Sequence, residues 1–479
     1  MKLTKLRLEN FRCFAELELG FHPQLNVLVA ENGQGKSTLL DAVRIALWPF
    51  VSSFDLARNA FSDSGNAIAI DDVRLLPLAT GDMARQLPAR IQMTGDFGMG
   101  SQKTWGRYRD SEVKSTKTKE EGDTDAMKLW AGAIQAQSRD PKADTLDLPV
   151  FGYYGTGRLW AQKRLTEALK KGKDDTRTTD FYVRTFAYLN CLDPASSYKH
   201  FKEWFIWAFE SYREEQIKQQ EQRPANLELA WGRIQVVQQA IDSFLRPTTG
   251  WHTLEYSVSR DKNLVLSHDQ YGTLEVDLLS DGIRSVLAMI GDIAYRCIKL
   301  NPHLGKDAAL KTCGVVLIDE VDMHLHPRWQ QLVLTQLREA FPRVQFIVTT
   351  HSPQVLTTVA SECIRVLATE LDEDTGSGRI ISKAVISQTQ GVASSDVLAE
   401  VMGIDPVPDI EQAHWLSQFK ALIQQDIHES DPGQKLYGKL EKHFGAEHPE
   451  ILECQRLIRL QAFKRKLPSR PSKDIGEKG

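Results

Sequence analysis

The stretch "NVLVAENGQGKSTLLDAV", residues 26–43, constrains the fold of this chain more than any other segment. Its apolar start predicts a buried strand, its glycines predict a tight turn, and the residues from Lys36 onward have helical spacing. The backbone N–H groups of such a turn and the positive end of the helix form a cradle for phosphate groups. In this pattern Lys36 reaches the β and γ phosphates of a nucleotide and Ser37 ligates Mg²⁺. We therefore predict a nucleotide site with Mg²⁺ here.

The segment departs at one position from the usual pattern G-x-x-x-x-G-K-[ST], because Ala30 occupies the place of the first glycine. The turn must therefore accept a Cβ atom at that point. A glycine turn before a helix can also be purely structural, but the adjacent Lys36 and Ser37 favour phosphate binding. The residues that we expect to line the nucleotide are Ala30, Asn32, Gly33, Gly35, Lys36, Ser37 and Thr38.

A second segment far along the chain, "GVVLIDEVDMHLHP", carries two adjacent carboxylates. Its apolar run from Val315 to Ile318 predicts a parallel strand buried on both faces, which delivers Asp319 and Glu320 to the carboxyl edge of the sheet. Sheets of this class bind ligands at that edge. We predict that Asp319 holds the Mg²⁺ shell and that Glu320 polarises the attacking water as a general base. Two carboxylates that merely end a strand are the alternative.

The residues that follow predict a helix and another buried strand. "RWQQLVLTQLREAF" places Trp329, Val333, Leu337 and Phe341 on one helical face, and "VQFIVTTHS" is a strand that ends in His351. A histidine at this edge can sense the γ-phosphate, although a single histidine there is often structural. The strand-helix-strand order favours the functional reading of His351.

The segment "LLSDGIRS" lies between these motifs and precedes an apolar-periodic helix. Its Ser280 and Gly282 would offer a hydroxyl and free N–H groups to a second anion. A helix cap explains Ser280 without any ligand. Since one chain rarely needs two γ-phosphate sites, we expect this one to serve a nucleotide bound to another subunit.

The composition is that of an ordinary globular chain of 479 residues, 42% hydrophobic and 25% charged. A formal net charge of -4 gives no global attraction to nucleic acid or anionic membranes. No apolar run approaches the roughly 18 residues of a spanning helix. The six cysteines are scattered without a C-x-x-C pair, which argues against a zinc site or a disulfide framework. We expect a cytoplasmic protein without membrane association.

The pattern along the chain predicts an α/β fold in four parts. Residues 1–160 form an N-terminal lobe, 161–247 a compact helical insertion, 248–387 a C-terminal lobe, and 388–479 a helical region with a basic, partly disordered tail. Within the first lobe, the charged stretch "SEVKSTKTKEEGDTDA" predicts an exposed loop.

Taken in order, "AENGQGKST", "LLSDGIRS", "VVLIDEVDMHLHP" and "VTTHS" resemble the ABC-type P-loop ATPases of the SMC, RecF and OLD group. The opening "LRLENFRCF" is similar to the first strands of that group. The resemblance covers roughly residues 1–60 and 270–356. It implies a split ATPase head that binds ATP and Mg²⁺, with two ATP molecules between two head-to-tail subunits and Ser280 of one subunit closing on the γ-phosphate of the other.

The same resemblance suggests two further site residues. Arg12 matches an arginine that can point towards the nucleotide or DNA, although an exposed strand arginine is the alternative. Gln92 is a weak candidate for the glutamine loop. Asp281 and Ile283 replace the glycine and glutamine of the transporter motif L-S-G-G-Q, which argues against a transporter ATPase.

Other members of the group fit less well. The insertion is shorter than about 90 residues, too short for a long coiled coil, and lacks a C-x-x-C hook. "LDEDTGSG" is the only acidic cluster soon after His351, and a hairpin turn explains it, so no nuclease site is evident. "VFGYYGTGRLW", the insertion and the tail look like the stand-alone ATPase subunits of anti-phage defence, of the Septu type and some retrons, which work with a separately encoded nuclease.

Three functional hypotheses follow. The first is an ATPase that assembles on ATP as a homodimer or a higher homo-oligomer, senses DNA or a phage-induced signal, and regulates a partner effector. The second is a RecF-like DNA repair ATPase, and the third is a scaffold held together by ATP with little turnover. Each of three basic clusters is either a contact for double-stranded DNA or a solvated face. They are Lys114, Lys117 and Lys119; Lys170, Lys171 and Lys173; and Lys464, Arg465 and Lys466.

Overall fold

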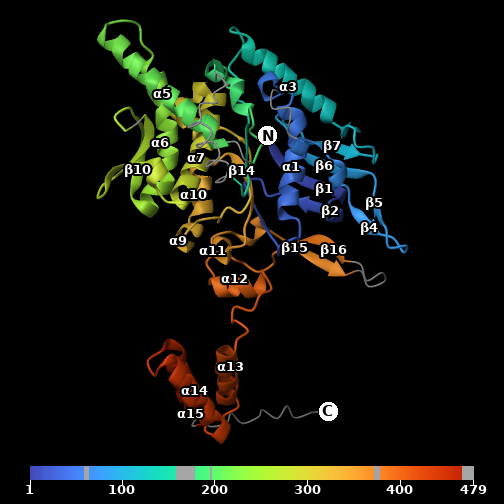
Figure 1. Cartoon of the computed structure of the whole chain (residues 1–479), viewed down its shortest axis with the longest axis vertical. Coiled ribbons are helices and arrows are strands. Elements are labelled where there is room, and N and C mark those ends of the chain that lie inside the picture. The colour runs from blue at the N-terminus through green and yellow to red at the C-terminus, as the bar shows by residue number, and fades with distance from the viewer. Residues whose placement is uncertain (59–63, 158–178, 195–196, 261, 372–377, 466–479) are drawn as a thin grey trace, which may run out of the picture. The chain divides into compact units, whose positions relative to one another are not determined.

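The computed structural model describes residues 1–58, 64–157, 179–194, 197–260, 262–371 and 378–465 (Figure 1). The chain forms two compact units, Met1–Met402 and Gly403–Gly479. Each unit has its own hydrophobic core. No helix in the described part of the chain has the length and apolar character needed to cross a membrane.

The strands of the first unit are β1 (Lys2–Phe11), β2 (Phe14–Gly20), β3 (Leu25–Val29), β4 (Leu75–Pro77), β5 (Met83–Arg85), β6 (Ala89–Asp96), β7 (Lys103–Arg109), β8 (Lys119–Gly122), β9 (Val150–Tyr154), β10 (Trp251–Ser257), β11 (Asn263–His268), β12 (Gly272–Glu275), β13 (Gly314–Ile318), β14 (Val344–Thr349), β15 (Ile364–Leu371) and β16 (Gly378–Ala384). Its α-helices are α1 (Lys36–Val51), α2 (Asp55–Arg58), α3 (Thr124–Arg139), α5 (Ser197–Gln220), α6 (Leu227–Thr249), α7 (Asp281–Leu300), α8 (Ala308–Lys311), α9 (Pro327–Gln330), α10 (Val333–Ala340), α11 (Pro353–Leu356) and α12 (Ser394–Glu400).

The central sheet has six strands in the order β16-β15-β3-β14-β13-β9. All neighbours are parallel except the hairpin of β15 and β16. Strands β3, β9, β13 and β14 are buried over their whole length, as predicted for parallel strands covered on both faces. The sheet therefore combines strands from distant parts of the sequence and brings their carboxyl ends to one edge.

A second, antiparallel sheet has the order β2-β1-β6-β7-β8. Helix α1 contacts β6 and β7 as well as β14, so it lies between the two sheets (Figure 1). The indole Nε1–H of Trp105 on β7 donates to the carbonyl of Ala46 on α1 at 2.9 Å, which fixes the helix against this sheet. The mixed α/β class predicted from the sequence is confirmed.

Helices α5, α6 and α7 lie side by side beyond the central sheet (Figure 1). Helix α7 contacts β9 and is buried along most of its length, whereas α6 also packs against the small antiparallel sheet β10-β11-β12. Within the helical insertion predicted for residues 161–247, helices α5 and α6 are present, and residues 161–178 lie outside the described residues.

Two local predictions need correction. The stretch predicted as an exposed loop, residues 111–126, contains strand β8 and the start of α3. Its charged residues sit on an edge strand paired with β7, where charged side chains are common. The helix predicted over 328–341 is divided into α9 and α10. The Gln330 side chain donates to the carbonyl of Leu325 at 2.9 Å, which holds α9 against the preceding turn.

The second unit contains α13 (Glu411–Gln424), α14 (Asp431–Phe444) and α15 (Pro449–Arg465). These helices enclose a small core of their own. The boundary between the compact units lies after Met402. The fourfold division of the chain stays a prediction. The acidic cluster of residues 371–378 lies mostly outside the described residues, and so do Lys170, Lys171, Lys173 and Lys466.

Candidate nucleotide site

The loop between β3 and α1 has the backbone that a phosphate cradle needs. Gly33 and Gly35 have left-handed φ angles of 84° and 89°, which side chains rarely adopt. A Cβ atom on Gly35 would also lie 2.6 Å from the Sγ atom of Cys13. Ala30, by contrast, does not have a positive φ angle. The turn therefore accepts the Cβ of Ala30, and the departure from the usual motif does not distort the loop.

The side chain of Lys36 folds back over this loop. Its Nζ atom donates to the carbonyls of Ala30 at 2.8 Å and Glu31 at 3.0 Å, and the side chain is buried. Burial lowers the pKa of Lys36, while the nearby Asp319 and other carboxylates partly offset this effect. The ammonium group thus lies inside the loop, hydrogen-bonded to two of its carbonyls. Asn32 is exposed on the same loop.

The central contact of the site joins the two motifs. The hydroxyl of Ser37 at the start of α1 donates to Oδ2 of Asp319 at 2.7 Å, and the hydroxyl of Thr349 donates to Oδ1 at 2.6 Å. Hydroxyl and carboxylate oxygens are the ligands that Mg²⁺ prefers. The separation of the Ser37 and Asp319 oxygens also suits two adjacent ligands of one small octahedral ion. The residues present therefore fit Mg²⁺.

Glu320 directly follows Asp319 in a left-handed backbone conformation with φ of 49°. Its N–H group donates to the hydroxyl of Thr349 at 2.8 Å, so the same threonine positions both acidic residues. A strained backbone at a non-glycine residue is typical of functional sites. His351 follows β14 at the same sheet edge and is half-buried. The structure thus brings Lys36, Ser37, Asp319, Glu320 and His351 to the carboxyl ends of three adjacent strands.

Arg12 lies in the turn after β1, and not in an exposed strand. Its guanidinium group contacts Asp41 on α1 at 2.6 Å and Asp72 at 2.7 Å. The hydroxyl of Tyr153 donates to the same Asp41 carboxylate at 3.2 Å. Arg12 is therefore bound to two carboxylates. This contact connects the opening strands to the helix that follows the phosphate loop.

Ser280 and Gly282 lie at the start of α7. Ser280 is exposed and caps the helix without a side-chain hydrogen bond. A Cβ atom on Gly282 would lie 2.6 Å from the carbonyl oxygen of His324, so close packing against that turn accounts for the glycine. No hydrogen bond or ion pair of the described residues joins Ser280 to the phosphate loop of its own chain. The structure therefore does not join Ser280 and the phosphate loop of the same chain into one site.

A comparison with protein families agrees with this geometry. A family model described as "AAA domain" matches residues 5–245, about half of the chain. The chain belongs to this AAA domain family. A second AAA domain model, whose description also mentions the AbiEii toxin and a type IV TA system, matches residues 191–357. The prediction that the chain is a P-loop ATPase is confirmed.

Individual relatives of this AAA domain protein are named after defence systems. "Retron Vc95 probable ATPase" of Vibrio cholerae is 26% identical over 88% of this chain and 82% of its own length. "Retron Ec83 probable ATPase" of Escherichia coli is 26% identical over 95% of this chain and 86% of its own length. Septu protein PtuA of Bacillus thuringiensis is 26% identical over 43% of this chain and 50% of its own length. An Smc head domain from Pyrococcus furiosus covers 80% of this chain with 14% identity and a TM-score of 0.45.

These relatives confirm the resemblance to ATPases named after retrons and to a protein named after the Septu system. Within the AAA domain, the predicted glutamine-loop candidate Gln92 lies on β6 and donates to Glu121 at 2.9 Å. It is thus part of the antiparallel sheet. Thr38 lies on α1 beside the Cys13 thiol.

Several residues that contact the acidic residues after β13 were not identified from the sequence. Thr349 joins Asp319 to the backbone of Glu320, and the hydroxyl of Thr350 donates to Asp322 at 2.6 Å. The pair of threonines before His351 was the available signal. Tyr154 was missed as well: its carbonyl accepts from the N–H of Asp319 at 2.8 Å. These contacts position the acidic residues.

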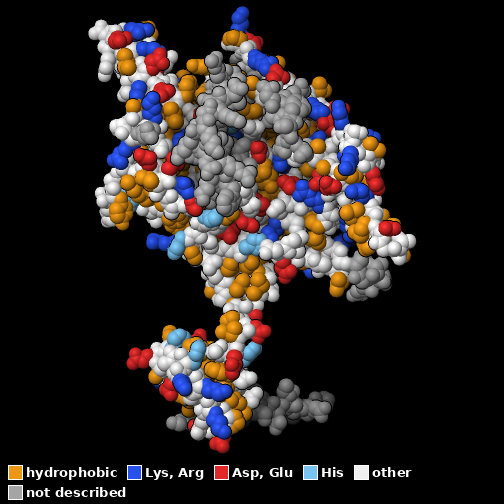
Figure 2. All heavy atoms as spheres, in the orientation of Figure 1, with side chains coloured by type: hydrophobic (Ala, Val, Ile, Leu, Met, Phe, Trp, Pro, Cys, Tyr) orange, Lys and Arg blue, Asp and Glu red, His pale blue; other side chains and the backbone are white. Residues whose placement is uncertain are grey.

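The predicted DNA-contacting lysines differ in their surroundings. Lys114 and Lys117 are exposed, whereas Lys119 forms an ion pair with Asp110 at 2.6 Å. Lys464 is exposed near the end of α15. On the face of the AAA domain protein shown in Figure 2, basic and acidic side chains are interspersed. Among the described residues on this face, no broad basic surface for a nucleic-acid backbone is seen.

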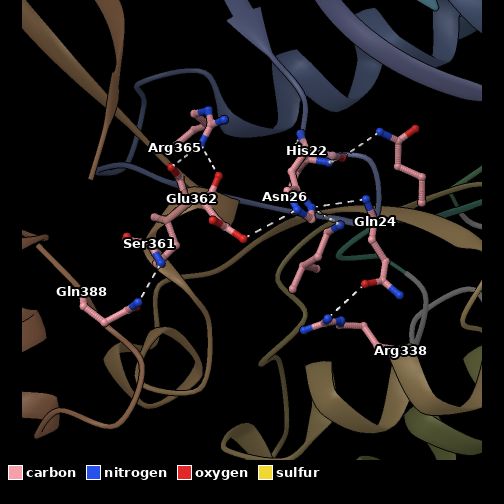
Figure 3. Close-up of polar contacts among 11 residues, drawn as sticks. His22, Gln24, Asn26, Arg338, Ser361, Glu362, Arg365 and Gln388 are labelled. Carbon is pink, nitrogen blue, oxygen red and sulfur yellow. Dashed lines mark hydrogen bonds and ion pairs between the residues drawn. The ribbon is translucent and has the colours of Figure 1, made fainter. Parts of the chain in front are cut away.

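A cluster at the end of β3 opposite to the phosphate loop contains three residue types that bind metals: His22, Glu362 and Cys363. Figure 3 shows His22 and Glu362 with their polar contacts. Nδ1 of His22 accepts from the backbone N–H groups of Gln24 and Leu25 at 3.3 Å. The ring proton then belongs on Nε2, the atom that faces Glu362 at 3.9 Å. A metal-binding histidine needs the opposite arrangement, with its second nitrogen as a donor. We therefore interpret this cluster as a structural clamp on the turn before β3.

Proposed function

We propose that two copies of this chain bind two ATP molecules between them, hydrolyse them, and thereby control a separately encoded nuclease in anti-phage defence. The contact of Ser37 with Asp319 at the phosphate-loop edge is the observation that carries the catalytic part of this proposal. Ser280 is exposed and forms no hydrogen bond with its own phosphate loop among the described residues, which supports the dimeric part.

In this proposal each side chain at the edge has a defined task. Lys36 transfers its hydrogen bonds from the loop carbonyls to the β and γ phosphates. Ser37 and Asp319 hold Mg²⁺, which when bound neutralises charge on the phosphates. Glu320 accepts the proton of the attacking water, and His351 donates to a γ-phosphate oxygen. Ser280 of the second copy would close the site with its hydroxyl and the N-terminal N–H groups of α7.

A mixing experiment tests whether each site is shared. Chains with Lys36→Ala and chains with Ser280→Arg should each lose ATP turnover. In a 1:1 mixture, half of the dimers combine both variants, and each of these dimers contains one intact site. Turnover should therefore recover to about one quarter of the wild-type rate. If the mixture stays as inactive as its components, the two residues act in the same chain and the shared site is wrong.

The defence role rests on the relatives named after retrons and Septu systems. It is tested by plating phage on cells that carry this gene with its neighbouring genes. We expect fewer plaques with the intact set. Protection should disappear with Lys36→Ala, and also when the neighbouring nuclease gene is deleted. Protection that survives Lys36→Ala would show that ATP binding does not control the effector.

ATP turnover in the presence of DNA separates the remaining alternatives. Steady-state turnover of the purified chain is measured with and without linear double-stranded DNA, with Glu320→Gln as the blank. A partner-controlled regulator should turn over slowly and should not respond to DNA. Strong stimulation by DNA would favour direct DNA sensing or a RecF-like repair ATPase, and no turnover above the blank would favour an ATP-bound scaffold.

A further inference from the structure

A cavity of about 230 Å³ lies among helices α5, α6 and α7, and no residue of the phosphate loop lines it. Trp204, Trp207 and Ser211 line it from one face of α5, at spacings of three and four residues. Arg233 of α6 and Lys299 of α7 line it from the other helices, which lie beside α5 (Figure 1). Three neighbouring helices therefore contribute to one pocket.

The two cations of this cavity share one aromatic ring. The guanidinium carbon of Arg233 lies 5.2 Å from the ring centre of Trp207, and Nζ of Lys299 lies 5.9 Å from it. Neither cation forms a hydrogen bond or an ion pair with any residue that the structure describes. The cation–π contacts with Trp207 stabilise both positive charges in part. They leave the N–H donors of both groups available to a ligand.

The position of Lys299 is costly without a counter-charge. The side chain is buried, and burial together with repulsion by Arg233 lowers the pKa of Lys299 to about 7. Arg184, the third cation of the cavity, differs: it donates to the carbonyls of Leu146 at 2.6 Å and Leu300 at 2.7 Å. Arg184 thus has a structural role. Glu215 attracts Arg233 without forming an ion pair with it, and Lys299 has no carboxylate partner among the residues that the structure describes.

The remaining walls are aromatic. The ring of Phe181 lies 6.1 Å from Trp207, and the ring of Tyr182 lies 5.7 Å from it at a right angle. The buried indole Nε1–H of Trp204 has no hydrogen-bond partner in the described part of the chain. Tyr182 is 81% exposed, so the cavity reaches solvent beside this residue. A ligand can therefore enter here and place a flat ring against the aromatic wall.

We propose that this cavity binds a small phosphorylated ligand with an aromatic ring, of the mononucleotide class. The phosphate lies between Arg233 and Lys299, where it neutralises both cations through charge-assisted hydrogen bonds. The ring packs against Phe181 and Trp207. The site is separate from the phosphate loop, and it does not depend on the function proposed above.

Calorimetric titration of the full-length chain with adenosine monophosphate tests this site. All variants carry Lys36→Ala, which removes binding at the phosphate loop. Arg233→Gln and Lys299→Met should each weaken binding by at least about tenfold, because each removes one charged donor. Arg246→Gln is the matched control, since Arg246 is an exposed arginine on the same helix. It should leave the affinity unchanged.

Two further arms identify the recognised chemistry. Adenosine, which lacks the phosphate, should bind at least about tenfold more weakly than the monophosphate. Inorganic phosphate should compete with the monophosphate for the cavity. Thermal unfolding shows whether each variant is folded, and Lys299→Met should not lower the midpoint, because it removes a buried charge. Failure of the monophosphate to bind the Lys36→Ala chain at millimolar concentration would overturn the proposal. Equal binding by Arg233→Gln, Lys299→Met and Arg246→Gln would overturn it as well.

Discussion

The Ser37 hydroxyl donates to the Asp319 carboxylate at 2.7 Å, although the two residues are 282 positions apart in the chain. The contact exists because β3 and β13 are both parallel members of one sheet, separated only by β14. Parallel strands end at the same edge, so the residues that follow them converge there.

The first prediction concerns the general base. Glu320→Gln should lower ATP turnover by about 10²-fold or more, because an amide cannot accept the proton of the attacking water. The variant should still bind ATP and accumulate as a dimer, whereas Lys36→Ala should lose ATP binding. Turnover assays and size-exclusion chromatography with and without ATP measure both effects.

Glu339→Gln is the matched control for this prediction, since Glu339 is an exposed glutamate on α10. It should leave turnover at the wild-type rate. Wild-type turnover by Glu320→Gln would mean that another group activates the water.

A second prediction concerns Thr349, the hydroxyl that joins Asp319 to the backbone of Glu320. Thr349→Val should leave the buried Asp319 carboxylate and the partly buried Glu320 N–H group without this partner. It should lower the free energy of unfolding by about 1–3 kcal/mol. Loss of this support should also raise the Mg²⁺ concentration needed for half-maximal turnover by about tenfold or more. Urea unfolding and magnesium titrations are the measurements.

Thr349→Ser retains the hydroxyl and should stay close to the wild type in the Mg²⁺ titration. If the valine and serine variants need the same Mg²⁺ concentration, the hydroxyl does not position Asp319.

The third prediction concerns the buried ion pair between Arg296 and Asp292 on α7, at 2.7 Å. The hydroxyl of Tyr154 also donates to this carboxylate at 2.7 Å. Arg296→Met should lower the free energy of unfolding by about 3–5 kcal/mol, because it leaves a buried carboxylate without its counter-charge. Urea unfolding followed by circular dichroism measures this difference.

Lys311 and Asp307 supply a control with the same helical spacing of four residues at an exposed position. Lys311→Met should change the free energy of unfolding by less than about 1 kcal/mol. Equal effects of the two substitutions would show that burial of the pair on α7 is not what makes it important.

The fourth prediction concerns pH. The pKa of Lys299 is lowered from 10.5 to about 7 by burial and by Arg233. Between these two pH values the unfolded chain binds more protons at this residue than the folded chain, so the free energy of unfolding should rise with pH. The wild type should therefore gain stability relative to Lys299→Met as the pH increases from about 7 towards 10.

Chemical unfolding of both proteins at several pH values between 6 and about 10 measures the difference. If the stability difference between the wild type and Lys299→Met falls as the pH rises, or does not change, the pKa of Lys299 is not lowered in the folded chain. Adenosine monophosphate bound in the cavity should make the stability difference depend less steeply on pH, because a nearby anion raises the pKa of Lys299 again.

Short-range patterns in the sequence determined the strands, the phosphate loop and the acidic edge. Left-handed glycines at positions 33 and 35 and the apolar run from Val315 to Ile318 act over a few residues, so they can be recognised without knowledge of the fold. The same local reasoning failed at residues 111–126. Their charge pattern is compatible with an edge strand as well as with a loop, and only the pairing with β7 decides between them.

Tertiary structure alone decided which side chains meet. Arg12 contacts Asp41 and Asp72 because a turn carries it towards α1, and nothing near Arg12 in the sequence indicates this. Likewise, Arg233 and Lys299 come together only because α5, α6 and α7 pack around Trp207. The backbone preference of a residue and the spacing of apolar residues depend on neighbours in the sequence. Contacts across tens to hundreds of positions depend instead on how whole helices and strands pack.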